Sequence, residues 1–387
     1  MVFHNMKVAL LVFPIHYSHG CLLQTYALYS KLKELGCEVT VLDRQPERTP
    51  FFQCGITILK RLIKKLLFGY KGDIFYRNQF PMIIMAEQQH FIDRFRKDII
   101  SVHSSLELQK VMEAGHFQAI VVGSDQTWRP KYVPNVMDYW LDFVESYDIL
   151  KVAYAPSFGT DEWEYSEGQT ERCKSLASRF SALSVREDSG VSLCEKYLNV
   201  DAMHVLDPTL LHTQQFYYDL IKVIPERESF CQCYFLDRTD EKEAIANLIA
   251  SQMHLAVNYI NTKTEDTNAS VKDRIAPSVE KWLAGFIAGK FMVVDSFHAM
   301  VFSIIFQRDF VVIGNKKRGL SRFESLLKGL GLADRLVFNK DEALMVAGRP
   351  INWDNVQERL NYLRNKSYCF LETSLRYSKK VVTSTRL

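Results

Sequence analysis

The feature that most limits the fold of this chain is an alternation between short apolar runs and longer segments with helical periodicity. The first unit has an apolar run over Lys7 to Phe13, a helical pattern over Leu22 to Leu35 closed by Gly36, and a second apolar run over Cys37 to Leu42. Apolar strands separated by helices are typical of a parallel sheet covered by helices. The sequence therefore predicts an α/β fold.

The same alternation continues to about residue 313. Further strands are predicted at Gln118 to Val122, Lys151 to Ala155, Ser181 to Val185, Ala202 to Leu206, Phe230 to Leu236, His254 to Ile260, Phe291 to Val294 and Phe310 to Ile313. In open parallel sheets, ligands bind outside the carboxyl ends of the strands. The loops after these strands are therefore the places to search for functional residues.

The length indicates two domains, because 387 residues exceed the roughly 150 that are usual for one. Asp207-Pro208 breaks a predicted strand, and a new alternation begins beyond it. We therefore expect an N-terminal α/β domain over residues 1–205, with an insertion at about 51–80. A second such domain is expected over 206–387, with a final helical segment, Trp353 to Tyr377, packing back towards the junction.

Charge and cysteine content exclude several classes of protein. The 48 basic and 45 acidic residues leave a net charge of +3, which is too small to predict nucleic-acid binding. None of the eight cysteines has CxxC spacing, and Cys231 and Cys233 fit one face of a strand, so no metal site is predicted. The apolar run Val8 to Phe13 is too short for a signal or spanning segment, so we expect a cytoplasmic protein.

The expected insertion contains a basic amphipathic helix at residues 59–67. Apolar side chains recur with helical spacing at Leu59, Leu62, Ile63, Leu66 and Leu67, and the residues between them are Lys60, Arg61, Lys64 and Lys65. Such a helix suits the surface of an anionic membrane, which would make the protein peripheral at the inner face of the cytoplasmic membrane. The alternative is a helix whose apolar stripe joins the hydrophobic core while its lysines face water.

Polar side chains follow the predicted strand Gln118 to Val122. Asp125 is suited to act as a general acid or base, and Ser124 and Gln126 to hydrogen-bond sugar hydroxyls. Trp128 lies in the same loop. The alternative is an Asx turn with Trp128 in the core.

A second polar loop, Asp295-Ser296-Phe297-His298, follows the strand Phe291 to Val294 and opens a helix. The positive end of a helix favours the neutral form of imidazole, which suits His298 to proton transfer near pH 7. The alternative is a histidine held in the core.

Arginines at strand ends are candidates for binding a small anion, because a guanidinium forms paired hydrogen bonds with carboxylate or phosphate. Arg186 follows the strand Ser181 to Val185 and precedes a helix, whose N–H groups would face the same anion. The loop after Phe310 to Ile313 adds further cations, among them Lys316, Arg318 and Arg322. Ser157 lies at another strand end, and Gln24 lies on the first helix.

Several common signatures are missing from the sequence. No GxGxxG follows the first strand, and no GxxxxGK, HExxH or GxSxG is present. The sequence therefore gives no support to a dinucleotide oxidoreductase, a P-loop nucleotidase, a zinc protease or a hydrolase with a nucleophile elbow.

Taken together, the sequences of these loops resemble those of the polysaccharide pyruvyl transferases. The matching segments occur in the family's order over roughly residues 18–330. They are Ser18-His-Gly-Cys-Leu-Leu-Gln-Thr-Tyr-Ala-Leu28, Gly123-Ser-Asp-Gln-Thr-Trp128, Tyr154-Ala-Pro-Ser-Phe-Gly159, Leu183-Ser-Val-Arg-Glu-Asp-Ser-Gly190, Leu206-Asp-Pro-Thr-Leu210, Asp295-Ser-Phe-His-Ala299 and Arg318-Gly-Leu-Ser-Arg322. The resemblance implies two Rossmann-like domains facing across a cleft, as in B-type glycosyltransferases, and transfer of pyruvate from phosphoenolpyruvate to a sugar as a ketal.

The resemblance also suggests roles for the candidate residues. It favours His298 for proton transfer and Asp125 for activating the attacking hydroxyl. Better-studied family members carry an arginine or a similar residue where Ser296 stands here, so the role of that arginine is expected to fall to Arg186, Arg318 or Arg322. Binding of phosphoenolpyruvate is assigned to Arg186, Ser296, Lys316, Arg318 and Arg322. The acceptor sugar is assigned to Ser124, Gln126, Trp128, Ser157 and Gln24. The scheme requires no cofactor and no metal.

The family implies that the acceptor is a hexose, of galactose type, on a polyprenyl-diphosphate-linked precursor of a bacterial capsule or exopolysaccharide. Two other functions remain open from the sequence. A B-type glycosyltransferase using a nucleotide sugar would share the architecture, and a non-catalytic saccharide-binding protein would keep the cleft but tolerate loss of Asp125 and His298.

Overall fold

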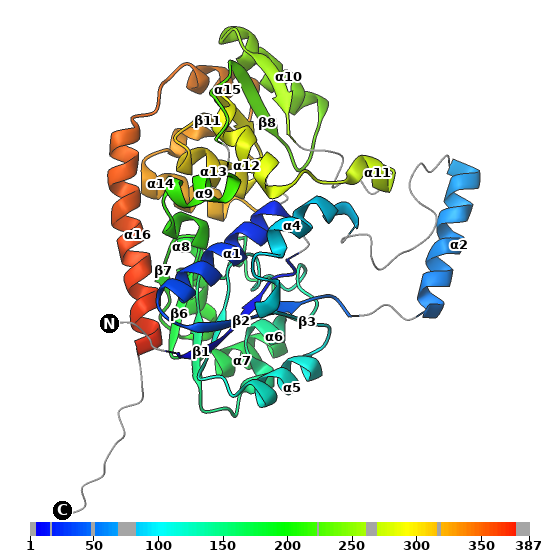
Figure 1. Cartoon of the computed structure of the whole chain (residues 1–387), viewed down its shortest axis with the longest axis vertical. Helices are drawn as coiled ribbons and strands as arrows, with labels where there is room; N and C mark the ends of the chain where they lie inside the picture. The colour runs from blue at the N-terminus through cyan, green and yellow to red at the C-terminus, as the bar shows by residue number, and fades with distance from the viewer. Residues whose placement is uncertain are drawn as a thin grey trace, which may run out of the picture.

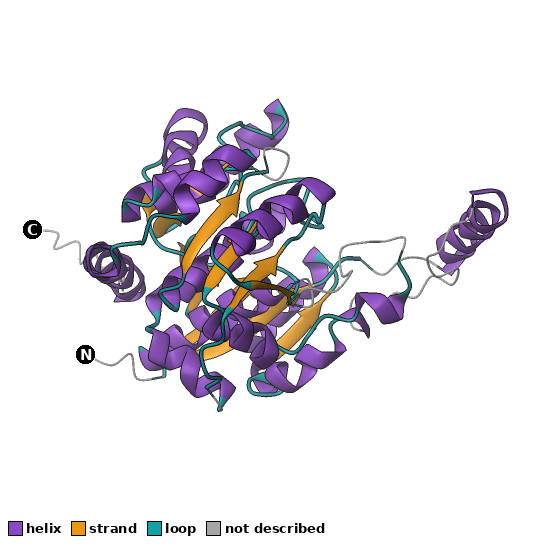
Figure 2. Cartoon of the chain, turned by 90° about the horizontal axis from the view of Figure 1, so that it is seen from above, coloured by secondary structure: helices purple, strands orange, loops and turns teal. Residues whose placement is uncertain are grey.

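The computed structural model describes residues 5–15, 18–47, 51–68, 83–222, 224–260, 269–315 and 319–376. Within these residues the chain forms two parallel sheets, one of seven strands and one of five (Figure 1). Helices lie on both sides of the strands (Figure 2). The predicted α/β architecture with two Rossmann-like domains is confirmed.

The first sheet has the strand order β3-β2-β1-β4-β5-β6-β7. Its strands are β1 (Lys7–Val12), β2 (Glu38–Arg44), β3 (Ile99–Val102), β4 (Ala119–Val122), β5 (Leu150–Ala153), β6 (Ala182–Val185) and β7 (Met203–His204). The direction in which strands are added reverses between β1 and β4, which pair in parallel. A reversal of this kind opens a crevice at the carboxyl ends of the two strands.

The second sheet has the order β12-β11-β10-β8-β9. Its strands are β8 (Phe230–Tyr234), β9 (Ala256–Tyr259), β10 (Phe291–Val294), β11 (Asp309–Ile313) and β12 (Leu336–Val337). Here the order reverses between β8 and β10, which also pair in parallel. Each sheet therefore has its own crevice at the carboxyl ends of its strands.

Helices connect most of the strands. Those of the first half are α1 (His19–Glu34), α2 (Phe51–Phe68), α4 (Gln89–Ile92), α5 (Ser105–Gly115), α6 (Val136–Tyr139), α7 (Glu167–Ala177) and α8 (Asp188–Leu193). Those of the second half are α9 (Gln214–Ile221), α10 (Asp240–Gln252), α11 (Val271–Arg274), α12 (Val279–Ala288), α13 (Phe297–Ile305), α14 (Ser321–Leu330), α15 (Lys340–Ala347) and α16 (Trp353–Arg376). Short 3-10 turns complete the connections, among them η5 (Pro208–Leu211).

The sequence did not predict β3 and β12, which are two of the four edge strands of the two sheets. In β3 only one of four residues is buried, and β12 has only two residues. Neither strand contains the apolar run by which the inner strands were found. Edge strands are covered less than central ones, so their hydrophobic signal is weak.

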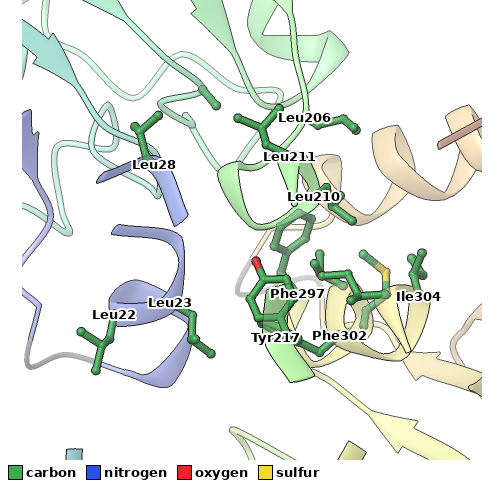
Figure 3. Packing of buried hydrophobic residues seen from close by; sticks show 14 of the residues in the cluster. Leu22, Leu23, Leu28, Leu206, Leu210, Leu211, Tyr217, Phe297, Phe302 and Ile304 are labelled. Carbon is green, nitrogen blue, oxygen red and sulfur yellow. The ribbon is translucent and has the colours of Figure 1, made fainter. Parts of the chain in front are cut away.

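One hydrophobic core extends across both halves of the chain. Leu22 and Leu28 of α1 belong to the same buried cluster as Leu210 of η5 and Phe302 of α13. Figure 3 shows Leu210 and its neighbour Leu211 between the leucines of α1 and the aromatic side chains of the second half. The segment after β7 therefore fills the space between the two sheets.

The last helix, α16, returns to the first domain. The Ser367 hydroxyl accepts a hydrogen bond of 2.9 Å from the backbone N–H of Leu206. The ring of Phe370 lies 6.3 Å from that of Tyr154, which follows β5. In Figure 1, α16 runs along the side of both domains.

A buried histidine also links the two halves. His19, at the start of α1, is 3% exposed, and its Nε2 lies 2.7 Å from the carbonyl oxygen of Pro277. Its ring stacks on Trp282 of α12, with centroids 5.2 Å apart. Burial lowers the pKa of His19 to about 4, and the hydrogen bond to Pro277 opposes this only in part.

The buried position of His19 favours its neutral form. We therefore expect acid to destabilise the contact between the two halves of the chain. The pKa in the folded chain lies below the unfolded value, so stability is complete above pH 6.5 and is lost as the pH falls towards 4. We expect this residue alone to reduce the free energy of unfolding by roughly 3 kcal/mol over that interval. Denaturant unfolding at pH 7.5, 6 and 5 measures the slope. It should be shallower in His19→Gln, and equal slopes would contradict the assignment.

Helix α2 does not bury its apolar stripe. The side chains of Leu59, Leu62, Ile63, Leu66 and Leu67 are between 38% and 81% exposed. The alternative in which this stripe joins the hydrophobic core is therefore wrong. No helix in the described part of the chain is both long and apolar enough to cross a membrane.

Candidate active site

A cavity of about 120 Å³ lies where the crevices of the two sheets meet. The first domain contributes loops after β1 and β4, and the second domain contributes loops after β8 and β10 and the start of α14. Its lining residues are Phe13, Ser18, Gly20, Asp125, Gln126, Tyr132, Tyr234, Leu236, Trp282, Asp295, Ser296, Phe297, His298, Arg322 and Phe323. Of the residues predicted for the site, Asp125, Gln126, Ser296, His298 and Arg322 meet here.

Asp125 lies at the carboxyl end of β4 in a left-handed backbone conformation, with φ of +80°. Its Oδ1 accepts the backbone N–H of Gln126 at 2.8 Å, and its Oδ2 accepts the thiol of Cys21 at 3.0 Å. Burial would raise the pKa of Asp125, but the charges of Arg186 and His298 outweigh it and lower that pKa. Asp125 is therefore held as a carboxylate, the form that a general base requires.

Asp207 is a second carboxylate, located just outside the cavity lining. Its Oδ2 lies 2.6 Å from Nη1 of Arg186 and 3.5 Å from Nε2 of His298. Its Oδ1 accepts the hydroxyl and the backbone N–H of Thr209 at 2.6 and 3.0 Å. Burial would raise the pKa of Asp207, but His298, Arg186 and Thr209 hold it well below the usual range.

Two arginines approach the site from different domains. The guanidinium carbons of Arg186 and Arg322 lie 4.8 and 5.5 Å from the ring centroid of Phe297. Burial and the neighbouring charge of Arg186 lower the pKa of Arg322 to about 10, so it remains a cation near neutral pH. Arg322 lines the cavity, whereas Arg186 and Asp207 line a neighbouring cavity of about 300 Å³ that shares Phe297 with it.

His298 is the second residue of α13, and its side chain is 10% exposed. Ser296 precedes the helix but forms no capping hydrogen bond, so the N–H groups of the first turn face the cavity without a side-chain cap. Nε2 of His298, Nε and Nη2 of Arg186 and Nε of Arg322 are buried and form no close hydrogen bond in the described chain. Two of them, Nε2 of His298 and Nη2 of Arg186, lie 3.5 Å from a carboxylate oxygen of Asp207 and of Asp125, respectively. Groups of this kind are the expected partners of a bound anion.

Several predicted residues do not line the cavity. Trp128 is fully buried, donates to the carbonyl oxygen of Tyr139 and stacks on Trp140 at 4.0 Å. The structure therefore places it in the core, as the alternative for this loop proposed. Lys316 and Arg318 lie outside the described residues.

The other three predicted acceptor residues are buried behind the cavity. The Ser124 hydroxyl donates to the carbonyl oxygen of Ala155, and that of Ser157 donates to the carboxylate of Glu187. Gln24 donates to the carbonyl oxygen of Ser124 at 3.4 Å. These side chains hold the loops that carry Asp125 and Arg186 but do not reach the cavity.

A sequence profile described as polysaccharide pyruvyl transferase matches residues 19–317. The matched segment covers most of the chain and includes Asp125, Asp207 and His298. The chain belongs to this family. It is therefore a transferase of the polysaccharide pyruvyl transferase type. Among curated protein sequences, none is significantly similar.

Solved structures with the same fold are distant in sequence from this pyruvyl transferase. UDP-GlcNAc 2-epimerase from Methanocaldococcus jannaschii aligns with a TM-score of 0.53 at 11% identity, covering 94% of this chain and 100% of its own. The Arabidopsis thaliana protein UGT89C1, complexed with UDP-L-rhamnose, has a TM-score of 0.52 at 10% identity, covering 95% and 98%. The UDP-GlcNAc 2-epimerase of Neisseria meningitidis has a TM-score of 0.51 at 10% identity, covering 96% and 100%. These similarities show the two-domain GT-B fold.

The sequence analysis missed two features of this pyruvyl transferase site. Asp207 was interpreted only as part of the Asp-Pro break between the domains, although it also occurs in a segment shared with the family. Gly20 was included only as part of the first segment shared with the family, yet a Cβ atom added there would lie 2.1 Å from Nδ1 and 2.4 Å from Cγ of His298. The absence of a side chain at position 20 therefore creates the space that the imidazole occupies.

We expect Gly20→Ala to displace the imidazole of His298. The added carbon would also lie 2.9 Å from Cβ of His298, so rotation of the ring alone cannot relieve the clash. A displacement of about 1 Å costs about 10²-fold in turnover, and we expect a loss of that size. Gly168→Ala in α7 is the matched control, because an added Cβ there meets no atom within 4 Å. Full activity of Gly20→Ala with a normal melting temperature would contradict the prediction.

Proposed function

We propose that this pyruvyl transferase transfers pyruvate from phosphoenolpyruvate to two hydroxyls of one hexose, forming a ketal and releasing phosphate. One observation carries the proposal. His298, Asp125 and Arg322 line a single cavity, in which His298 and Arg322 each present a buried nitrogen that forms no hydrogen bond in the described chain. An acid–base pair beside hydrogen-bond donors suited to an anion is what this reaction needs.

The buried hydrogen-bond donors of the site favour an anionic donor substrate. The two carboxylates, Asp125 and Asp207, are matched by the guanidiniums of Arg186 and Arg322. Phosphoenolpyruvate would add a carboxylate and a phosphate, whose oxygens would accept hydrogen bonds from these donors. Arg322 and the first turn of α13 would hold the anionic groups, with Ser296 beside them. Arg186, whose guanidinium lies against the ring of Phe297, would contribute its positive charge without lining the cavity.

Each proton that moves in the proposed reaction has a donor and an acceptor. A proton from His298 would add to the methylene carbon of phosphoenolpyruvate, leaving an oxocarbenium-like carbon. Asp125 would accept the proton of the first sugar hydroxyl as its oxygen attacks that carbon. The C–O bond to phosphate breaks, and the second hydroxyl closes the ketal. Of the two hydroxyl protons, one replaces the proton that His298 gave to the new methyl group and the other leaves with phosphate.

The cavity wall suits a sugar acceptor. Phe13, Tyr132, Tyr234, Trp282 and Phe323 line it, and Gln126 lies beside Asp125. Aromatic faces pack against the apolar face of a sugar ring, while an amide hydrogen-bonds its hydroxyls. We propose a hexose of galactose type on a lipid-linked capsule or exopolysaccharide precursor as the acceptor.

Phosphate release from phosphoenolpyruvate tests the function. The acceptors are galactose-, glucose- and mannosamine-terminated sugars, each as lipid-linked and nucleotide-linked forms, with the product mass measured alongside. A product heavier by pyruvate less one water establishes ketal transfer and names the acceptor. Release of nucleotide from an activated sugar, with no response to phosphoenolpyruvate, would instead establish a glycosyltransferase.

A further inference from the structure

Helix α2 exposes an apolar surface that is unusual for this chain. Six of the fourteen large hydrophobic side chains that are exposed in the described residues lie in this one helix, and the remaining eight are distributed over other elements. Leu66 is 81% exposed, Leu67 70% and Leu59 59%. Both views show α2 standing apart from the two domains (Figures 1 and 2). Single exposed apolar residues need no explanation, but a cluster of six on one helix does.

The six side chains form one continuous face. At about 100° per residue, Leu59, Leu62, Ile63, Leu66 and Leu67, together with Ile56, fall within an arc of about 140°. The 18 residues of α2 extend for roughly 27 Å. A helix of this shape can insert one side into an apolar phase along its whole length.

The opposite face of α2 is basic. Lys60, Lys64 and Lys65 lie on it and are exposed, and Arg61 lies among them. The helix contains no aspartate or glutamate, so its charge is +4. A second copy of α2 would bring these like charges together, whereas an anionic bilayer would neutralise them.

We propose that α2 binds the surface of an anionic lipid bilayer. The helix lies flat in the headgroup region, with the six apolar side chains among the upper acyl chains and the lysines against lipid phosphates. The six apolar side chains determine how deeply the helix inserts. The basic side chains give it a preference for anionic lipid. This inference concerns a surface outside the catalytic cavity, so it stands or falls independently of the proposed function.

Binding of the full chain to vesicles tests the proposal. Sedimentation with vesicles of phosphatidylglycerol and phosphatidylcholine is compared with sedimentation with phosphatidylcholine alone, both at 0.05 M and 0.5 M NaCl. We expect strong binding only to the anionic vesicles at low salt, because the Debye length shrinks several-fold at the higher ionic strength. No binding to the anionic vesicles would overturn the proposal.

Two variants separate α2 from the rest of the surface. Changing Leu66 and Leu67 together to Glu should lower the partition coefficient at least about tenfold, since two side chains are withdrawn from the apolar phase and two negative charges are added. Leu106→Glu in α5 is the matched control, because its side chain is 59% exposed on a helix outside the proposed surface.

The variants decide between lipid and protein as the partner. Wild-type binding by the Leu106→Glu variant and loss of binding by the double variant support the proposal. Equal binding by the double variant and the wild type would overturn it. Self-association that depends on Leu66 and Leu67, without binding to vesicles, would also overturn it and would assign α2 to a protein interface.

Discussion

Replacing His298 with alanine is expected to lower turnover by about 10²- to 10⁴-fold, the range typical of a lost acid–base group. Among the described residues that line the cavity, His298 has the one imidazole, and its Nε2 faces the carboxylate of Asp207 at 3.5 Å. Phosphate release under saturating donor and acceptor measures the effect. Because the variant keeps Asp125 and Arg322, the Michaelis constant for phosphoenolpyruvate should change much less than turnover.

Two comparisons make the His298 result specific. Added imidazole should restore part of the activity of His298→Ala, because the truncation leaves space next to Gly20. His90→Ala, on α4, changes an exposed histidine outside the cavity and should retain wild-type turnover. Near-normal activity of His298→Ala would remove this residue from proton transfer.

Asp207→Asn is expected to lower both stability and activity. Asp207 and Arg186 form a buried ion pair at 2.6 Å, with side chains 0% and 1% exposed. Removing one charge of such a pair costs about 3 to 5 kcal/mol in the free energy of unfolding. We expect a loss near the lower end, because Asp125 still faces Arg186 at 3.5 Å. Activity of the folded protein should also fall, since His298 loses the carboxylate that faces it.

Asp138→Asn is the matched control. Asp138 pairs with Arg44 at 2.7 Å and is as buried as Asp207, but it lines neither the cavity nor its neighbour. This variant should lose comparable stability and keep the turnover of the folded fraction. If both variants keep full turnover, Asp207 has a structural role only.

The pH dependence of the Asp207 effect has a defined sign. The pKa of Asp207 is lower in the folded chain than in the unfolded one, so its contribution is complete above the unfolded value of about 3.9 and is lost as the pH falls below it. The difference in unfolding free energy between the wild type and Asp207→Asn should therefore shrink below about pH 4. A constant difference through that range would contradict the assigned pairing.

The sequence predicted the inner strands and the loops that follow them. Parallel strands place their carboxyl ends at one edge, so Asp125 and His298 could be named as site residues without knowing how the domains face each other. The partners of these residues could not be predicted. The approach of Gly20 to His298 and the position of Asp207 depend on the placement of one domain against the other, which no local pattern encodes.

The burial of individual side chains could not be predicted from the sequence either. Trp128 and Ser124 lie in the same loop as Asp125, but one fills the core beside Trp140 and the other is turned towards Ala155. For α2 the sequence pattern identified an apolar face and a basic face. It left open whether the apolar face contacts a membrane or the hydrophobic core. The exposure of Leu66 and Leu67 excludes the hydrophobic core as the environment of the apolar face.

The core that extends from α1 through Leu210 to Phe302 limits how this protein can be divided or recombined. A cut near residue 205 would leave apolar surface on both fragments, so neither is expected to fold as a separate module. Chimeras that exchange one half with a relative would need to carry α1, η5 and α9 together as matched parts. Altering acceptor choice is therefore better attempted by replacing loops around the cavity than by exchanging halves.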